Sequence, residues 1–151
     1  MRRPQERKYL IIRGVGNKVV EETVSAGDLA QIVKKEYDLV ICKATGTMVV
    51  TSPSGKRITY EGKWPRMGET SLAVLEALLI NGNEYLKPSE LADLTGNRNL
   101  KRNSALAARI LAIRKTLHDK TEKYIQTQKT PGHYAVRWTG RPWIWIERMR
   151  D

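Results

Sequence analysis

Apolar and polar positions alternate along the first part of the chain with the period of two that is typical of strands. Two pairs of such segments flank turn-forming residues and are expected to form hairpins, and one compact apolar run is expected to be a buried strand. In chain order these strands are residues 9–15 and 18–24, residues 38–43, and residues 47–51 and 57–61. Between the first pair and the apolar run, residues 26–37 carry Leu29, Ile32 and Val33 at helical spacing and are expected to form a helix.

From residue 69 onward the apolar positions recur every three or four residues, as on one face of a helix. The longest of these stripes consists of Leu106, Ile110, Ile113 and Leu117. Alternation then returns on both sides of the turn sequence Lys-Thr-Pro-Gly, which predicts a hairpin. The expected elements are helices at residues 69–81, 88–94 and about 103–118, and strands at residues 124–127 and 134–138.

A helix, a short helix, a longer helix and a hairpin follow one another in a winged helix-turn-helix. We therefore expect an α+β protein in which residues 46–151 form a winged helix-turn-helix domain that ends in an aromatic strand. A small α/β segment, residues 1–45, is expected to precede it. The role of this segment is left open, with interaction or dimerisation as the favoured interpretation.

Net charge favours a polyanionic partner. The chain carries a formal charge of +11, and residues 96–137 hold ten lysines and arginines against two acidic residues. Residues 66–95 hold two basic residues against five acidic ones, so the positive charge is segregated. Such a distribution points first to nucleic acid and second to an anionic membrane surface, with a merely soluble basic protein as the plainer alternative.

Two stretches resemble the DNA-binding domain of OmpR/PhoB-type response regulators. Residues 124–134 (Y-I-Q-T-Q-K-T-P-G-H-Y) resemble the wing motif of that family, I-x-T-V-R-G-x-G-Y, and residues 110–117 (I-L-A-I-R-K-T-L) resemble its recognition helix, I-S-R-L-R-K-K-L. The resemblance spans about residues 66–138. It implies a winged helix-turn-helix that binds double-stranded DNA and regulates transcription. Too few residues precede the motif for a receiver domain, and Lys43 stands where its phosphoacceptor aspartate would be needed.

The sequence departs from the family pattern at positions that affect base recognition. Thr130 replaces the first wing glycine, and Lys129 replaces the arginine of that turn. The outward face of the expected recognition helix is small and nearly apolar, so it offers few donors to base edges. An alternative interpretation therefore stays open, in which the winged helix acts mainly on RNA polymerase or another protein and DNA affinity is secondary.

Three groups of residues are expected to contact DNA. The loop would contact the phosphate backbone, the helix would enter the major groove, and the wing would reach phosphate or the minor groove. The residues are Arg98, Lys101 and Arg102 in the loop, Ser104, Ala108, Arg109, Ala112 and Lys115 on the helix, and Gln128, Lys129, Thr130 and His133 in the wing. In the resembling family the loop corresponding to residues 97–102 also contacts RNA polymerase, which makes that enzyme a second expected partner.

Signals for other chemistry are weak. The single cysteine, Cys42, excludes an internal disulfide, and together with His118 and His133 it does not form a zinc-binding pattern. No catalytic constellation and no cofactor motif is found, so we expect a protein that is not an enzyme. No apolar run is long enough to span a membrane, and a cytoplasmic, nucleoid-associated location is expected. The tryptophans of the C-terminal strand are expected to lie in the core or in a homodimer seam, in preference to stacking on bases.

Overall fold

The computed structural model describes residues 8–15, 18–33, 37–43, 45–61, 67–82, 84–130 and 133–148. Its fold is mixed α+β, which confirms the class expected from the sequence. The elements, in chain order, are β1 (Lys8–Val15), β2 (Lys18–Ser25), α1 (Ala26–Val33), β3 (Leu39–Cys42), β4 (Thr47–Thr51), β5 (Arg57–Tyr60), α2 (Gly68–Ile80), α3 (Pro88–Thr95), the 3₁₀ helix η1 (Arg98–Lys101), α4 (Asn103–Leu117), β6 (Ile125–Thr130), β7 (His133–Trp138) and β8 (Trp143–Arg148).

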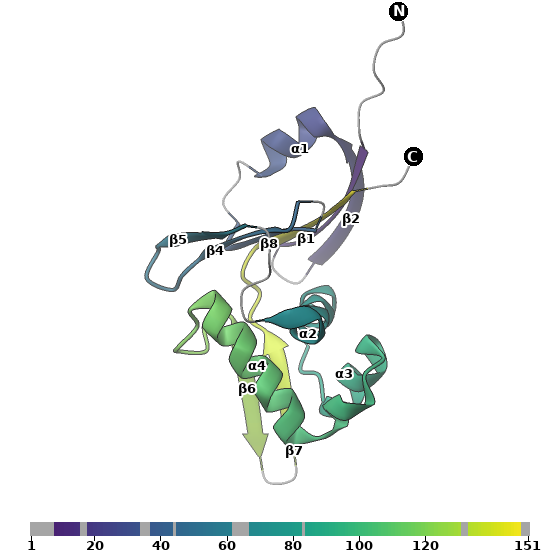
Figure 1. The fold of residues 1–151 in the computed structure, drawn as a ribbon, viewed down its shortest axis with the longest axis vertical. Coiled ribbons are helices and arrows are strands. Elements are labelled where there is room, and N and C mark those ends of the chain that lie inside the picture. The colour runs from purple at the N-terminus through teal and green to yellow at the C-terminus, as the bar shows by residue number, and fades with distance from the viewer. Residues whose placement is uncertain are drawn as a thin grey trace, which may run out of the picture.

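A six-stranded sheet forms the upper layer in Figure 1, with strand order β2-β1-β8-β3-β4-β5. The last strand, β8, lies in the middle, antiparallel to β1 and parallel to β3. The expected boundary between residues 45 and 46 falls between β3 and β4, which pair with each other. Residues from both sides of that boundary therefore share one sheet.

Both faces of the central strands are covered. On one face, Ile11, Ile144 and Ile146 form a small core with partly buried side chains of α1, among them Leu29. On the other face, Trp143 and Trp145 belong to the main core, which includes α2 and continues into α4 and the β6–β7 hairpin. In β3, Leu39 and Ile41 are buried in the main core, whereas Val40 and Cys42 point to the α1 side of the sheet and are only half-buried.

Gly14 lies in β1, directly opposite Trp143 of β8. A methyl group at this position would come within 2.1 Å of the Trp143 indole nitrogen. The glycine is therefore explained by the close approach of an indole ring to the β1 backbone. The local sequence, rich in glycine and asparagine, carries no sign of this distant contact.

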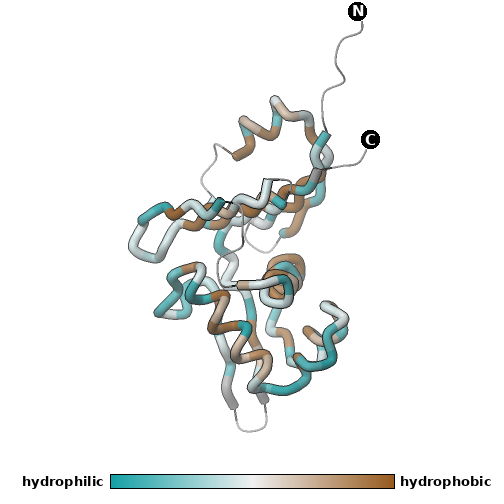
Figure 2. Tube along the Cα trace, in the orientation of Figure 1, coloured by the Kyte–Doolittle hydropathy of each residue, from teal (hydrophilic) through white to brown (hydrophobic). Residues whose placement is uncertain are grey.

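The helix α2 lies on the face of the sheet opposite α1, on the same side as α3 and α4 (Figure 1). Seven of its residues are buried, and it appears as the most uniformly apolar helix in Figure 2. Its buried side chains, such as Leu75 and Leu79, belong to the same core as Ile110 and Ile113 of α4. The stripe predicted on α4 is thus the side that faces the core, which leaves the opposite side of α4 exposed.

Local signals explain where the short helices begin and end. Pro88 starts α3, and the Lys87 backbone N–H donates to Glu90 Oε1 at 3.1 Å. Gly96 ends α3 in the left-handed region with φ of 70°. The helix α1 is described over Ala26–Val33, and Tyr37, at which the helix was expected to end, is buried and not helical.

Candidate nucleic-acid interface

The exposed surface of α4 carries most of the helix residues expected to contact DNA. Ser104, Ala108, Arg109 and Lys115 are exposed, and Ala112 is half-buried. The opposite side is fixed by Leu106, Ile110, Ile113 and Leu117, each of which is at most 1% exposed. This confirms the predicted division of α4 into a core side and an outer side.

Basic residues gather where η1 leads into α4. Arg98, Lys101 and Arg102 are exposed, in a segment that appears strongly hydrophilic in Figure 2. Within the described part of the chain, neither these three residues nor Arg109 and Lys115 forms an ion pair. The structure therefore brings together five exposed cations whose charge is not neutralised by a neighbouring carboxylate.

The β6–β7 hairpin lies beside α4. A hollow of about 250 Å³ between them is lined by Ala107 and Leu111 from the helix and by Thr127 and Tyr134 from the hairpin. The turn end of the hairpin and the amino end of α4 both lie at the end of the molecule remote from the six-stranded sheet (Figure 1). The candidate residues of the loop and of the first turns of α4 thus lie at the same end of the molecule as the hairpin turn, whereas Lys115 is in the last turn of α4.

The structure describes the hairpin residues only in part. Gln128 is exposed on β6. Lys129 pairs with Tyr134, and Thr130 with His133, in the backbone register of the hairpin. The side chains of Lys129, Thr130 and His133 and the turn residues 131–132 lie outside the described part of the chain, so their expected contacts stay predictions.

Arg114 links α4 to the hairpin, a role that the sequence analysis missed. Its Nη2 donates to Glu122 Oε1 at 2.9 Å, to the Ile125 carbonyl oxygen at 2.9 Å and to Thr127 Oγ1 at 2.6 Å. The last two acceptors are on β6. Arg114 was counted only as one basic residue among ten, although its place one turn from the core residue Ile110 could have suggested a partly buried contact.

The connection from α4 to β6 is held by a second polar residue that the sequence analysis missed, Asp119. This carboxylate is only 3% exposed and accepts the backbone N–H groups of Lys123, Tyr124 and Ile125 at 2.7, 3.1 and 3.0 Å. The preceding residue, His118, ends α4 with a left-handed φ of 55°. His118 is therefore the C-cap residue of α4. Its Nε2 lies 3.1 Å from the Tyr60 hydroxyl.

Burial near the hairpin raises the pKa of two tyrosines, Tyr134 and Tyr124. Desolvation is the main cause that raises the pKa of Tyr134, opposed by the positive charge of Arg114. Desolvation also raises the pKa of Tyr124 to about 12, and its hydroxyl donates to the Thr51 carbonyl oxygen in β4. Both rings therefore stay neutral near pH 7 and act as structural side chains between the hairpin and its neighbours.

The described residues give no sign of a metal site or of a membrane-spanning helix. They contain no group of three or more histidine, cysteine or acidic residues arranged to hold a metal ion. None of their helices has the length and apolar character needed to cross a bilayer. Trp138, Trp143 and Trp145 are at most 2% exposed, which confirms core packing for the aromatic C-terminal residues.

Comparison of the chain with protein-family models, with curated proteins and with solved structures finds no match. The candidate interface therefore rests on the geometry and charge of the chain itself.

Proposed function

We propose that this protein binds double-stranded DNA through a winged helix-turn-helix and regulates transcription. In this proposal α2, α3 and α4 are the three helices, α4 is the recognition helix, and the β6–β7 hairpin is the wing. One backbone feature supports the assignment. Leu86, between α2 and α3, forms an isolated bridge with Val136 of β7, so a third extended segment joins the hairpin.

The observation that carries the proposal is the set of five exposed cations without a carboxylate partner. A cation that already pairs with a carboxylate gains little from a phosphate, whereas an unpaired one releases condensed counterions when it binds DNA. All five lie on η1, at the start of α4 or along its exposed side. A helix placed in the major groove with η1 against the backbone would put them near phosphates.

Arg109 is the best candidate for base recognition. It is exposed on α4 and its guanidinium can donate two hydrogen bonds to the O6 and N7 atoms of guanine. Its helical neighbours Ala108 and Ala112 have no side-chain donors, although their small size permits close approach to a groove. Readout at this helix would therefore rest on few residues, and the hairpin would add affinity. With this role the protein would work in the cytoplasm, at the nucleoid.

The test compares two triple variants with the same change in net charge. Arg98→Gln/Arg102→Gln/Arg109→Gln removes three cations from the proposed interface, and Lys8→Gln/Lys18→Gln/Lys56→Gln removes three exposed cations of the six-stranded sheet region. Binding of a labelled 20-base-pair duplex is measured by fluorescence anisotropy over a salt series. Neither set contributes to the core, so both variants should keep the wild-type melting temperature.

We expect the wild-type protein to show a slope of log Kobs against log salt of about −4 to −6, because each phosphate contact contributes about −0.9. The interface variant should lose roughly three units of that slope, and the control variant less than about one. A wild-type slope near zero, or equal losses in the two variants, would contradict the proposal. Selection of bound DNA from a random pool then shows whether binding is sequence-specific.

A second candidate is a winged helix that binds protein, in particular RNA polymerase. The observation that favours it is Leu111, which lies on the outer side of α4 with 54% of its surface exposed. Beside it are Ala107 and the hollow that separates α4 from the hairpin. If the selected DNA pool stays random and Leu111→Gln abolishes capture of purified RNA polymerase while leaving duplex binding intact, the protein-binding role is the correct one.

A further inference from the structure

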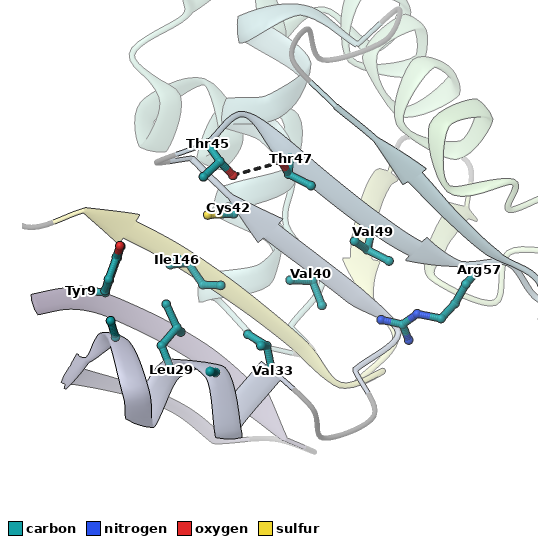
Figure 3. A pocket seen from close by; sticks show the side chains of 12 residues that line it. Tyr9, Leu29, Val33, Val40, Cys42, Thr45, Thr47, Val49, Arg57 and Ile146 are labelled. Carbon is teal, nitrogen blue, oxygen red and sulfur yellow. Dashed lines mark hydrogen bonds between the residues drawn. The ribbon is translucent and has the colours of Figure 1, made fainter. Parts of the chain in front are cut away.

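A second cavity lies on the far side of the six-stranded sheet from the proposed DNA-binding surface. It has a volume of about 470 Å³ and opens between α1 and the outer face of β8, β3 and β4 (Figure 3). Leu29 and Val33 of α1 form one wall, and Val40, Val49 and Ile146 of the sheet form the other. Among the described residues, α1 covers only part of this face, and the cavity lies beside it, over β3 and β4.

The size and lining of this cavity are those of a small-molecule site. Pockets that enclose small ligands have volumes of about 300–1,000 Å³ and mostly apolar walls with a few polar groups. In this cavity the polar groups are Tyr9, Arg57 and the pair Thr45 and Thr47, whose hydroxyls lie 3.0 Å apart. They stand at the margin, while aliphatic side chains line the space between α1 and the sheet (Figure 3).

Arg57 places a positive charge at the margin of this cavity. Its guanidinium reaches toward the cavity from β5 (Figure 3) and makes only two long hydrogen bonds, at 3.4 Å each, to the Tyr37 carbonyl oxygen and to Thr51 Oγ1. Among the described residues no carboxylate forms an ion pair with it. An arginine beside an apolar cavity and without an acidic partner can bind the carboxylate of a ligand, because its N–H groups can donate two parallel hydrogen bonds to the two carboxylate oxygens.

We propose that this cavity binds a small carboxylic acid with an apolar body, such as a short alkyl chain or an aromatic ring. The body lies between α1 and the sheet, and the carboxylate pairs with Arg57 at the margin. Burial of the apolar body supplies most of the affinity, and Arg57 selects the anion over its neutral analogue. This site is independent of the proposed DNA binding, and the two can fail separately.

The chain contains its own reporter, because its only cysteine, Cys42, lines the cavity. Octanoate is the probe, octan-1-ol its neutral analogue, and 1-anilinonaphthalene-8-sulfonate a fluorescent anion that octanoate should displace. Octanoate at ten times its dissociation constant should slow modification of Cys42 by a thiol reagent about tenfold, because about one molecule in eleven is then free. This measurement needs no substitution.

Two variants of cavity residues, at Arg57 and Val49, and one control variant, at Lys56, test where octanoate binds. Arg57→Gln should weaken octanoate binding about tenfold, since it removes a charge-assisted hydrogen bond, and should leave octan-1-ol unchanged. Lys56→Gln removes the same charge from the adjacent residue, which does not line this cavity, and should change octanoate binding less than about twofold. Val49→Phe should fill the space and abolish binding of both compounds, with the melting temperature as the check on folding.

Several outcomes would overturn the proposal. The first is that octanoate fails to protect the Cys42 thiol and to displace the dye from the folded protein. The second is that octanoate binds no better than octan-1-ol and binds equally well to Arg57→Gln. Binding that survives Val49→Phe in a folded protein would locate the site elsewhere. A wild-type dimer that dissociates in Val49→Phe, as measured by sedimentation velocity, would make this groove an interface between two copies of the chain.

Discussion

The Asp119 side chain organises the turn between α4 and β6. The turn between α4 and β6 must satisfy several backbone N–H groups that no helix or strand accepts, and this carboxylate accepts three of them while almost fully buried. Bonds to an ionised acceptor are stronger than those between neutral groups. The residue therefore sets the direction in which the chain leaves α4 and enters the hairpin.

Replacing Asp119 with alanine should lower the free energy of unfolding by about 3 kcal/mol, because three backbone donors lose their acceptor. Asp119→Asn keeps one side-chain oxygen and should cost less. Urea unfolding at pH 7 measures both values. The matched control is Glu122→Gln, which removes the same charge from an exposed residue whose ion pair with Arg114 should contribute less than about 1 kcal/mol. Equal losses at the two positions would contradict the anchoring role.

Ionisation of Tyr124 makes the stability of the fold depend on pH in the alkaline range. Its ring is 3% exposed and stacks on Trp138 at a centroid distance of 5.5 Å, and burial is the main cause that raises its pKa from 10.0 to about 12. The fold favours the neutral hydroxyl. Its contribution to stability is thus complete below pH 10 and is lost as the pH rises through the folded pKa.

Between pH 9 and pH 11, the wild-type protein should therefore lose about 1 kcal/mol more of its free energy of unfolding than Tyr124→Phe, which cannot ionise at this position. Urea titrations at the two pH values measure the difference. At pH 7 the phenylalanine variant should be less stable by about 1 kcal/mol, since it loses the hydrogen bond to Thr51. Parallel pH curves for the two proteins would show that Tyr124 ionises freely in the fold.

At the scale of elements, the described contacts hold α4 and the hairpin together as one unit. Arg114 joins the helix to β6, and the Leu86–Val136 bridge joins β7 to the segment between α2 and α3. In the proposed function this unit presents the helix and the wing to the same duplex. Their contributions should differ, because a helix in the groove meets base edges and a hairpin tip meets mainly phosphates.

Lys129→Ala and Arg109→Ala separate these contributions. The lysine variant should bind all duplexes more weakly by a similar factor, with a salt slope smaller by about one unit. The arginine variant should lose roughly 1–3 kcal/mol on the selected duplex and relax the preference at one or two base pairs. Anisotropy on selected and scrambled duplexes measures both effects, with Lys8→Ala as the control. Unchanged DNA binding in both variants, with loss of affinity for RNA polymerase, would favour the protein-binding role.

Elements with a strong local period were predictable from the sequence. The stripe Leu106, Ile110, Ile113 and Leu117 repeats every three or four residues, and burial on α4 follows it. The end of α1 was less predictable, because the apolar period continues past Val33 while Tyr37 is buried outside the helix. The cationic residues of η1 and α4 were identified from charge segregation, from the helical period and from the family resemblance, and the structure exposes them.

Features made by distant residues were not predictable. The sequence gives no reason for a glycine at position 14 of an expected strand, whereas the structure does, because the indole ring of Trp143 in β8 lies against the β1 backbone there. The residues 143–148 were recognisable as a strand, but no local signal gives its partners, β1 and β3. The roles of Arg114 and Asp119 were not predicted, since the Ile125 carbonyl and the three N–H groups that they bind are backbone groups, which carry no sequence signature.

At the scale of the whole molecule, one core joins the sheet to the helices. Trp143 and Trp145 of β8, Leu75 of α2 and Ile110 of α4 belong to the same buried cluster. Hydrogen bonds add to this connection, because Tyr60 of β5 donates to the Thr116 carbonyl oxygen of α4 at 3.1 Å. Loss of packing among the helices should therefore destabilise the sheet as well, and the reverse should also hold.

We expect the described parts to unfold together, in one transition. Tryptophan fluorescence reports mainly on the sheet and the hairpin, and far-ultraviolet circular dichroism reports mainly on the helices, so their urea curves should coincide. Leu75→Ala, in the middle of α2, should shift both midpoints downward by the same amount and cost about 2–5 kcal/mol. Two separated transitions, or a shift confined to the helical signal, would mean that the sheet and the helices are stable independently.

The central position of β8 has a consequence for synthesis on the ribosome. The strands that flank it, β1 and β3, emerge early, but the strand that joins them follows the whole segment from α2 to β7. A nascent chain can thus complete the β1–β2 and β3–β5 hairpins, yet the sheet stays open along two unpaired edges until residues 143–148 have left the exit tunnel. During that interval the edge of β3 lacks its partner strand, so this is when we expect the chain most to need a chaperone.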